Sequence, residues 1–112
     1  MAKSFSVEIS MNEEPAQAQA LAASKLSDAA RRVGLRLAAQ SPGELCYRPR
    51  VQWPFLVMLW HRLNGEGMTV TFADRPDGGS RVRISGAVSG ASVELASDPE
   101  HWSEALGATP PA

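Results

Sequence analysis

The spacing of apolar residues changes from a strand pattern to a helix pattern within the first third of the chain. Phe5, Val7 and Ile9 alternate with polar residues, which predicts a half-buried strand. Between residues 18 and 33 the apolar residues recur at helical spacing, and Gly34 follows where a left-handed helix end is expected. Because this stripe is rich in alanine, the helix can approach a sheet closely but buries little apolar area. The core must therefore obtain its bulk from other elements.

The rest of the chain carries mainly the alternating pattern of strands, interrupted by turns rich in Gly, Pro and Asp. Two of these turns, at residues 41–43 and 75–79, each join two alternating segments into a hairpin. Near the C-terminus, Ser97-Asp98-Pro99-Glu100 reads as a capping box and predicts a short helix that ends before Gly107. The strands predicted after the long helix are residues 35–39, 45–51, 68–72, 82–84 and 88–95, the last interrupted at Gly90.

These elements predict an α+β two-layer sandwich. The expected order is β-α-β-β-(short helix)-β-β-β-α, in which Pro54 could begin the bracketed helix. Consecutive strands joined by short turns favour a mainly antiparallel sheet, with the long N-terminal helix and the short C-terminal helix on one face. A chain of 112 residues is about one domain. We expect a single α+β domain over residues 1–107 and a disordered tail over residues 108–112.

Composition excludes several classes of protein. Eleven Lys and Arg residues against twelve Asp and Glu residues argue against a nucleic-acid binder that relies on bulk charge. A lone cysteine, Cys46, forms no internal disulfide and fits a reducing compartment. Residues 1–10 lack the apolar run of a signal peptide, and the longest apolar run, Trp53–Trp60, has eight residues, too few to span a bilayer. These features predict a cytoplasmic protein.

The apolar segment at residues 53–63, between the two hairpins, needs a cover. Leaving three or four of its large side chains in water would forgo roughly 5 to 10 kcal/mol, which rivals the stability of a small domain. The cover can be the domain's own sheet, an apolar ligand, a second copy or partner protein, or a membrane surface. The membrane alternative is suggested by Arg48 and Arg50 before the apolar run Trp53–Trp60 and by Arg62 after it.

Residues 67–72 and 77–84 carry a family resemblance. With their Gly78-Gly79-Ser80 turn they resemble a hairpin common in START-like domains, the superfamily of the polyketide cyclases, and the opening strand followed by a helix is similar too. The resemblance covers about half of the chain. It implies a sheet curved around a C-terminal helix, with an apolar cavity for lipids or polyketides. The chain departs from the family pattern in its shortness, its single long first helix and its brief last helix.

Arginine residues gather on the predicted outer face of the sheet. Residues two apart on a strand lie about 7 Å from each other, so Arg48 with Arg50, or Arg81 with Arg83, could bracket a phosphate or a carboxylate. The alternative is a solvated face on which Glu8 and Glu94 are cross-strand partners. Single-stranded nucleic acid is disfavoured, because Ser and Thr rather than stacking aromatic residues are interleaved on this face.

Residues suited to catalysis are sparse and scattered. His61 and His101 have no neighbours at metal-ligand spacing, so no metal is expected. Cys46 would act as a nucleophile only if a cation such as Arg48 stabilised its thiolate. Neither a nucleophile elbow nor a phosphate-binding loop is present in the sequence. We therefore predict neither catalytic activity nor a cofactor.

The sequence favours a non-catalytic binding module for an apolar, lipid-like or polyketide-like ligand. The alternative is a protein-interaction domain that forms a homodimer or docks a partner, through the segment at residues 53–63 or through an unpaired sheet edge. The predicted ligand wall or interface consists of Trp53, Phe55, Met58, Leu59, Trp60 and Trp102.

Overall fold

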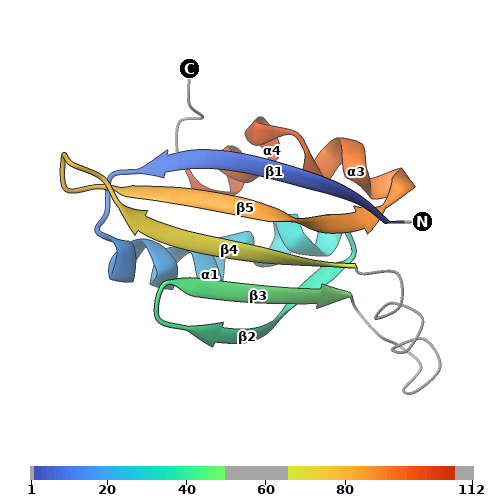
Figure 1. Ribbon diagram of the computed structural model, residues 1–112, viewed down its shortest axis with the longest axis horizontal. Helices are drawn as coiled ribbons and strands as arrows, with labels where there is room; N and C mark the ends of the chain where they lie inside the picture. Colours follow the sequence, from blue (N-terminus) through green and yellow to red (C-terminus); the bar gives the residue numbers. More distant parts are fainter. Residues whose placement is uncertain (1, 50–65, 108–112) are drawn as a thin grey trace.

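The computed structural model describes residues 2–49 and 66–107 as a five-stranded antiparallel sheet with helices on one face (Figure 1). The strands are β1 (Ala2–Met11), β2 (Leu35–Ser41), β3 (Glu44–Pro49), β4 (Gly67–Asp74) and β5 (Ser80–Ser89). The helices are α1 (Pro15–Arg32), α3 (Gly90–Ala96) and α4 (Pro99–Leu106). The strand order across the sheet is β1-β5-β4-β3-β2, so the first and last described strands of the chain are neighbours.

The predicted α+β class, the long helix after the first strand, both hairpins and the short C-terminal helix are confirmed. Helix α1 begins with Pro15 and is followed by Gly34, whose φ of 81° is the left-handed conformation expected after a helix. Helix α4 is capped by the Asp98 side chain, which accepts a hydrogen bond of 3.0 Å from the Glu100 backbone N–H. The N-cap is therefore Asp98 and not Ser97.

The predicted strand at residues 88–95 is wrong. Strand β5 continues to Ser89, and the chain then turns at Gly90 into helix α3. The segment is short, and its apolar residues fit both periods: Ala91, Val93 and Leu95 alternate as in a strand, whereas Val93 and Ala96 lie three apart as in a helix and pack toward the core. The sheet of the described residues thus has five strands, and Glu94 belongs to a helix and not to the outer sheet face. The short helix predicted at Pro54 lies outside the described residues.

The core lies between the helices and one face of the sheet. Alternate strand residues such as Ile9, Val70 and Ile84 are fully buried there, opposite the alanine-rich stripe of α1. Small alanine side chains allow α1 to lie close to the sheet, as its sequence predicts. Larger side chains elsewhere supply the bulk, above all Trp102 from α4 and Tyr47 from β3, which are 0% and 1% exposed.

The sheet has two edge strands of different character. Strand β1 pairs with β5 over ten consecutive residues, from Ala2 opposite Ser89 to Met11 opposite Ser80, without a register shift. Strand β2 pairs with β3, and its register shifts between Leu37 and Ala39. The bulge kinks β2, whereas β1 presents a regular edge.

Candidate functional site

Most residues of the predicted ligand wall lie outside the described residues. These are Trp53, Phe55, Met58, Leu59 and Trp60, and their role in ligand binding or in an interface stays a prediction. Trp102 is described: it is fully buried, and its Nε1–H donates to the Ala96 carbonyl oxygen over 2.7 Å. Its ring also contacts that of His101 edge-on, with centroids 4.7 Å apart. Trp102 is thus packed within the core between α3 and α4.

The predicted anion-binding arginines are not gathered into one cluster in the described residues. Arg81 and Arg83 on β5 both bind Glu8 on β1, with N–O distances of 3.1 and 3.4 Å. Arg48 is exposed on β3 and is separated from them by the intervening strand β4. Arg50 lies outside the described residues. Both guanidinium groups thus already have a carboxylate partner, which weakens the case for an anion site at Arg81 and Arg83.

Cys46 is held as a protonated thiol. Its Sγ lies 3.1 Å from Oε1 of Glu44, to which it donates a hydrogen bond, and the side chain is half-buried. The hydrogen bond to Glu44, together with burial and the charge of that carboxylate, raises the pKa of the thiol despite the opposing effect of Arg48. A raised pKa lowers the fraction of thiolate, the form that acts as a nucleophile.

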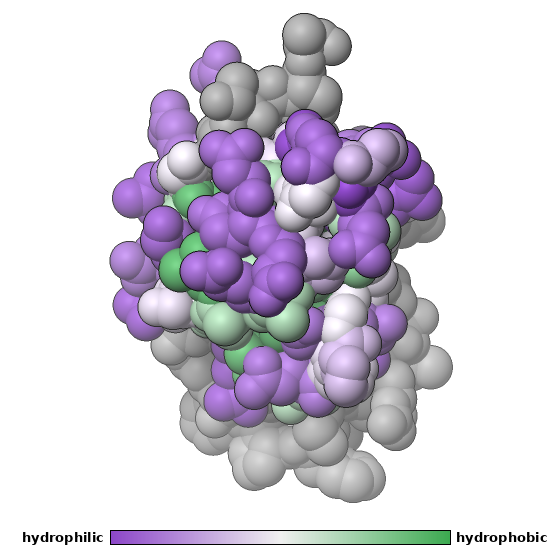
Figure 2. All heavy atoms as spheres, turned by 90° about the vertical axis from the view of Figure 1, so that its left-hand side faces the viewer, coloured by the Kyte–Doolittle hydropathy of each residue, from purple (hydrophilic) through white to green (hydrophobic). Residues whose placement is uncertain are grey.

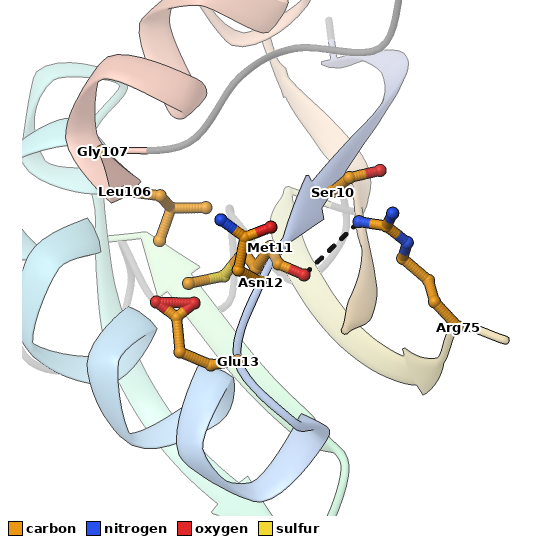
Figure 3. Close-up of a pocket in the computed structure, with 7 residues that line it drawn as sticks. All are labelled: Ser10, Met11, Asn12, Glu13, Arg75, Leu106 and Gly107. Carbon is orange, nitrogen blue, oxygen red and sulfur yellow. Dashed lines mark hydrogen bonds between the residues drawn. The ribbon is translucent and has the colours of Figure 1, made fainter. Parts of the chain in front are cut away.

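A first hollow, with a volume of about 200 Å³, lies where β1 ends and α1 begins (Figure 3). Arg75 reaches it from the β4–β5 turn and donates a hydrogen bond of 3.5 Å from Nη1 to the Met11 carbonyl oxygen. The same guanidinium also pairs with Asp77. The bond to Met11 ties the β4–β5 turn to β1. The guanidinium of Arg75 already has a carboxylate partner within the protein. The other lining residues are Ser10, Asn12, Glu13, Leu106 and Gly107.

The end of the molecule that carries the β4–β5 turn has a mainly hydrophilic surface, with small hydrophobic areas between the polar side chains (Figure 2). Large apolar side chains are well exposed at only two described positions, Leu37 on β2 and Leu95 on α3, at 36% and 37%. Neither a single leucine nor two separate ones form a large apolar patch. The hollows and the sheet edges are therefore the remaining candidate binding sites on the described surface.

A second hollow, with a volume of about 260 Å³, lies between α1 and the edge strand β2, and we call it the α1–β2 hollow. Its helix residues are spaced by four, which places them on one face of α1. Leu37 and Tyr47 face each other across the β2–β3 pair. The lining residues are Ala23, Ser27 and Arg31 from α1, Leu35, Arg36 and Leu37 from β2, and Tyr47 from β3.

Gln19 fixes the distance between α1 and the β2–β3 hairpin. Its side-chain amide donates to the Ser41 carbonyl oxygen over 2.7 Å, and its Oε1 accepts from the Gly43 backbone N–H over 2.7 Å. One side chain thus ties the hairpin turn to the second turn of the helix. These hydrogen bonds join the same two elements that form the α1–β2 hollow, at the hairpin turn and not at the hollow itself.

Tyr47 is one of the residues around the α1–β2 hollow, and it carries a buried polar atom. The residue is 1% exposed, and its hydroxyl has no hydrogen-bond partner within residues 2–49 and 66–107. Burial disfavours the charged phenolate and raises the pKa of Tyr47 to about 12. The hydroxyl therefore stays protonated at neutral pH and keeps a proton to donate.

The raised pKa of Tyr47 predicts a loss of stability at high pH. The unfolded chain releases the phenolic proton near pH 10 and the folded protein near pH 12, so stability falls as the pH rises between these values. A shift of two pKa units corresponds to about 2 to 3 kcal/mol. Urea unfolding across this range should show a smaller loss in Tyr47→Phe than in the wild type, because Cys46, whose pKa is also raised, acts in both. Tyr47 is the only tyrosine, so phenolate absorbance reports it alone; a midpoint near pH 10 would contradict the prediction.

The edge strand β1 is the longest stretch of exposed backbone in the described sheet. Alternate residues of an edge strand point their N–H and C=O groups away from the neighbouring strand. Apart from the bond between Arg75 and the Met11 carbonyl oxygen, no described group outside β5 hydrogen-bonds to β1. Helices α3 and α4 pack against this strand, and in the view of Figure 1 they extend past its free edge.

Comparison with known proteins finds no relative: no protein-family model and no curated protein matches the chain. The resemblance to START-like domains therefore stays a prediction. Within the described residues, no three His, Cys, Asp or Glu side chains are arranged to hold a metal ion. No helix in the described ranges is long and apolar enough to cross a membrane.

Sequence reasoning passed over the α1–β2 hollow. In the strand predicted at residues 45–51, Leu45 and Tyr47 lie two apart and so share one face, which is the buried face in the structure. The sequence did carry one signal of a polar group in this region: a tyrosine at an inward position of a strand brings a buried hydroxyl, and such a hydroxyl usually has a hydrogen-bond partner. Whether it finds one depends on α1 and β2, and the sequence did not show how these elements face it.

Proposed function

We propose that this protein is a non-catalytic interaction domain that binds an extended strand along β1, the partner being β1 of a second copy. One observation carries the proposal: β1 is a ten-residue edge strand without a bulge or a proline, and its outward backbone groups are left open by the described residues. Such an edge is a template for a further strand, because each added residue pair satisfies main-chain donors and acceptors.

The side chains of β1 suit pairing with another copy. A two-fold axis perpendicular to the sheet keeps both helix-covered faces on the same side and continues the sheet from one copy to the next. It brings the apolar residues Phe5, Val7 and Ile9 of the two strands together on the helix side. On the open side, small serines meet. The one acidic side chain there, Glu8, is already neutralised by Arg81 and Arg83, so it adds little repulsion.

The opposite edge strand, β2, is less suited to pairing with a further strand. The bulge between Leu37 and Ala39 interrupts the regular backbone of β2, and bulges are a common means by which edge strands avoid pairing. On the β1 side, Leu95 adds an exposed apolar side chain on α3, a helix that packs on β1 and β5. These differences favour β1 as the interaction edge.

Light scattering on the purified chain tests the proposal. We expect a mass of about 24 kDa for the wild type, twice the 12.0 kDa of one chain. Ser6→Lys places a lysine at the centre of the open side of β1, where like charges from two copies would meet, so the mass should fall toward that of one chain. The matched control is Ala39→Lys, which adds the same charge to the outer side of β2 and should leave the dimer intact.

Two results would overturn the proposal. One is a wild-type protein that has the mass of a single chain. The other is a Ser6→Lys variant that remains a dimer while circular dichroism shows it folded. Hydrogen exchange gives an independent readout, because dimerisation through β1 should protect its outward amides in the wild type and not in Ser6→Lys.

A further inference from the structure

Four exposed arginine residues gather at the end of the molecule where β2 begins and β3 ends, and we call them the basic end. Arg36 and Arg48 are direct partners in the β2–β3 ladder. Tyr47, the neighbour of Arg48, is buried on the helix side, so both arginines lie on the open side of the sheet. The last turn of α1 lies at the same end and carries the other two, Arg31 and Arg32 (Figure 1).

The charges of the basic end are not compensated within the described residues. None of its arginines forms an ion pair there, whereas Arg75, Arg81 and Arg83 all do. Arg36 and Arg48 also stand directly opposite each other, and like charges in this arrangement destabilise a sheet. The described fold therefore gains no stability from this placement, and an anion from outside would compensate both charges.

Gly67 leaves room for the side chain of Arg48. It lies beside Arg48 at the start of β4, and a Cβ atom at this glycine would come within 2.9 Å of Arg48 Nη1. The guanidinium is thus placed over the backbone of β4, and the residue remains exposed. A cation that is positioned without an internal partner is available to an external one.

The two ends of the molecule differ in charge. Lys3, at the start of β1, also lies toward the basic end, and the sheet spans about 19 Å from β1 to β2. Cations exceed acids among the described residues here: the cations are Lys3, Arg31, Arg32, Arg36 and Arg48, and the acids are Asp28, Glu66 and Glu94. Acids exceed cations at the opposite end, with Glu13, Glu14, Glu44, Asp74 and Asp77 beside Arg75 and Arg81.

The breadth of the basic end fits an extended anionic surface, and both membranes and nucleic acids present one. Proteins that hold single strands stack the bases on exposed aromatic rings, and the described Phe, Tyr and Trp side chains are all buried. Residues 50–65, which join β3 to β4 at this end, contain Trp53 and Trp60. Tryptophan is enriched at membrane interfaces, so the sequence here favours a lipid surface.

We infer that the basic end binds the headgroups of an anionic lipid surface, with Arg31, Arg32, Arg36 and Arg48 facing the membrane. Each arginine near such a surface strengthens binding about fivefold, and the effect fades within a Debye length, about 10 Å at 0.1 M salt. The inference goes beyond the proposed function and does not depend on it. The β1 edge runs along one side of the sheet, whereas the basic end lies at the end of the strands.

Sedimentation of the full chain with lipid vesicles tests the inference. We expect binding to phosphatidylcholine vesicles that contain about 30% phosphatidylserine, at about 0.1 M NaCl, and little binding to phosphatidylcholine alone. Raising NaCl to about 1 M shortens the Debye length to about 3 Å and should release the protein.

Two double variants locate the binding surface. Arg36→Gln combined with Arg48→Gln should weaken vesicle binding about twentyfold. The matched control combines Arg81→Gln with Arg83→Gln, which removes the same charge from the open side of β5, and it should change binding less than about threefold. Since Arg36 and Arg48 repel each other, the first variant should unfold at the wild-type urea concentration or above it.

The inference fails if the wild type does not bind the phosphatidylserine vesicles, or if it binds both kinds of vesicle equally. Equal losses in the two double variants would show general attraction between charges, and no binding surface. Tighter binding to duplex DNA than to vesicles, lost in the Arg36 and Arg48 variant, would identify a nucleic acid as the partner and overturn the inference. Light scattering of Ser6→Lys reports on the β1 interface separately, so the two proposals can fail independently.

Discussion

Replacing Gly86 with alanine is expected to destabilise the protein by at least about 3 kcal/mol. Gly86 lies in β5 between Phe5 of β1 and Met68 of β4. A Cβ atom at this position would lie 2.1 Å from the Gly67 carbonyl oxygen and 2.7 Å from the Met68 Cα. Both are backbone atoms of the paired strand, so no side-chain rotation can relieve the overlap. The β4 and β5 backbones would have to separate at the middle of the sheet.

Urea unfolding of two glycine variants measures this effect. Gly90→Ala is the matched control, because a Cβ there meets nothing within 4 Å and the residue begins helix α3. Alanine is the better helix former, so this variant should be as stable as the wild type or slightly more stable. If the two variants unfold at the same urea concentration, the close approach of β4 to β5 at Gly86 is wrong.

Much of the fold could be predicted from local patterns. The alternation of Phe5, Val7 and Ile9, the alanine stripe of α1 and the turn at residues 75–79 each express a preference that a few neighbouring residues decide. The strand, the helix and the turn that these patterns predict are all present in the structure. Local patterns did not predict the pairing of β1 with β5. This pairing joins residues about 80 positions apart and places β5 inside the sheet, between β1 and β4. Such pairing is a property of the whole chain.

The wrong prediction at residues 88–95 has a physical cause. Seven residues are too few to separate a strand period from a helix period: Ala91, Val93 and Leu95 alternate as in a strand, whereas Val93 and Ala96 are spaced as in a helix. Gly90 was interpreted as a bulge within a strand, and the structure uses it where β5 changes into α3. The choice is made by tertiary contacts, since Ala96 is fully buried and its carbonyl oxygen accepts the Trp102 indole proton.

The candidate sites were harder to predict than the fold, because their chemistry depends on which groups already have partners. Arg81 and Arg83 looked like a pair able to bracket an anion, yet Glu8, about 75 positions away, binds both. The strand pattern places Tyr47 on a face of the sheet and says nothing of its hydroxyl, which lacks a partner in the described residues. A sequence lists donors and acceptors, and only the folded arrangement shows which of them are satisfied.

Replacing Trp102 with alanine is the second change with a large expected effect, a loss of about 4 kcal/mol. The side chain is fully buried, and α1 faces the core mainly with alanines, whose short side chains cannot fill the cavity. The change would also leave the Ala96 carbonyl oxygen without the 2.7 Å hydrogen bond that it accepts from the indole. An unsatisfied buried acceptor lowers the free energy of unfolding further, beyond the loss caused by the cavity.

The variant Trp102→Phe separates these two contributions. It keeps an aromatic ring in the core and removes the indole N–H, so it should lose about half as much stability as Trp102→Ala. Urea unfolding followed by circular dichroism measures both variants, since this signal does not depend on tryptophan. If Trp102→Ala unfolds at nearly the wild-type urea concentration, Trp102 does not provide the bulk that the alanine stripe of α1 lacks. A wall residue of an open ligand site would show that small loss, because its ring would be solvated before binding.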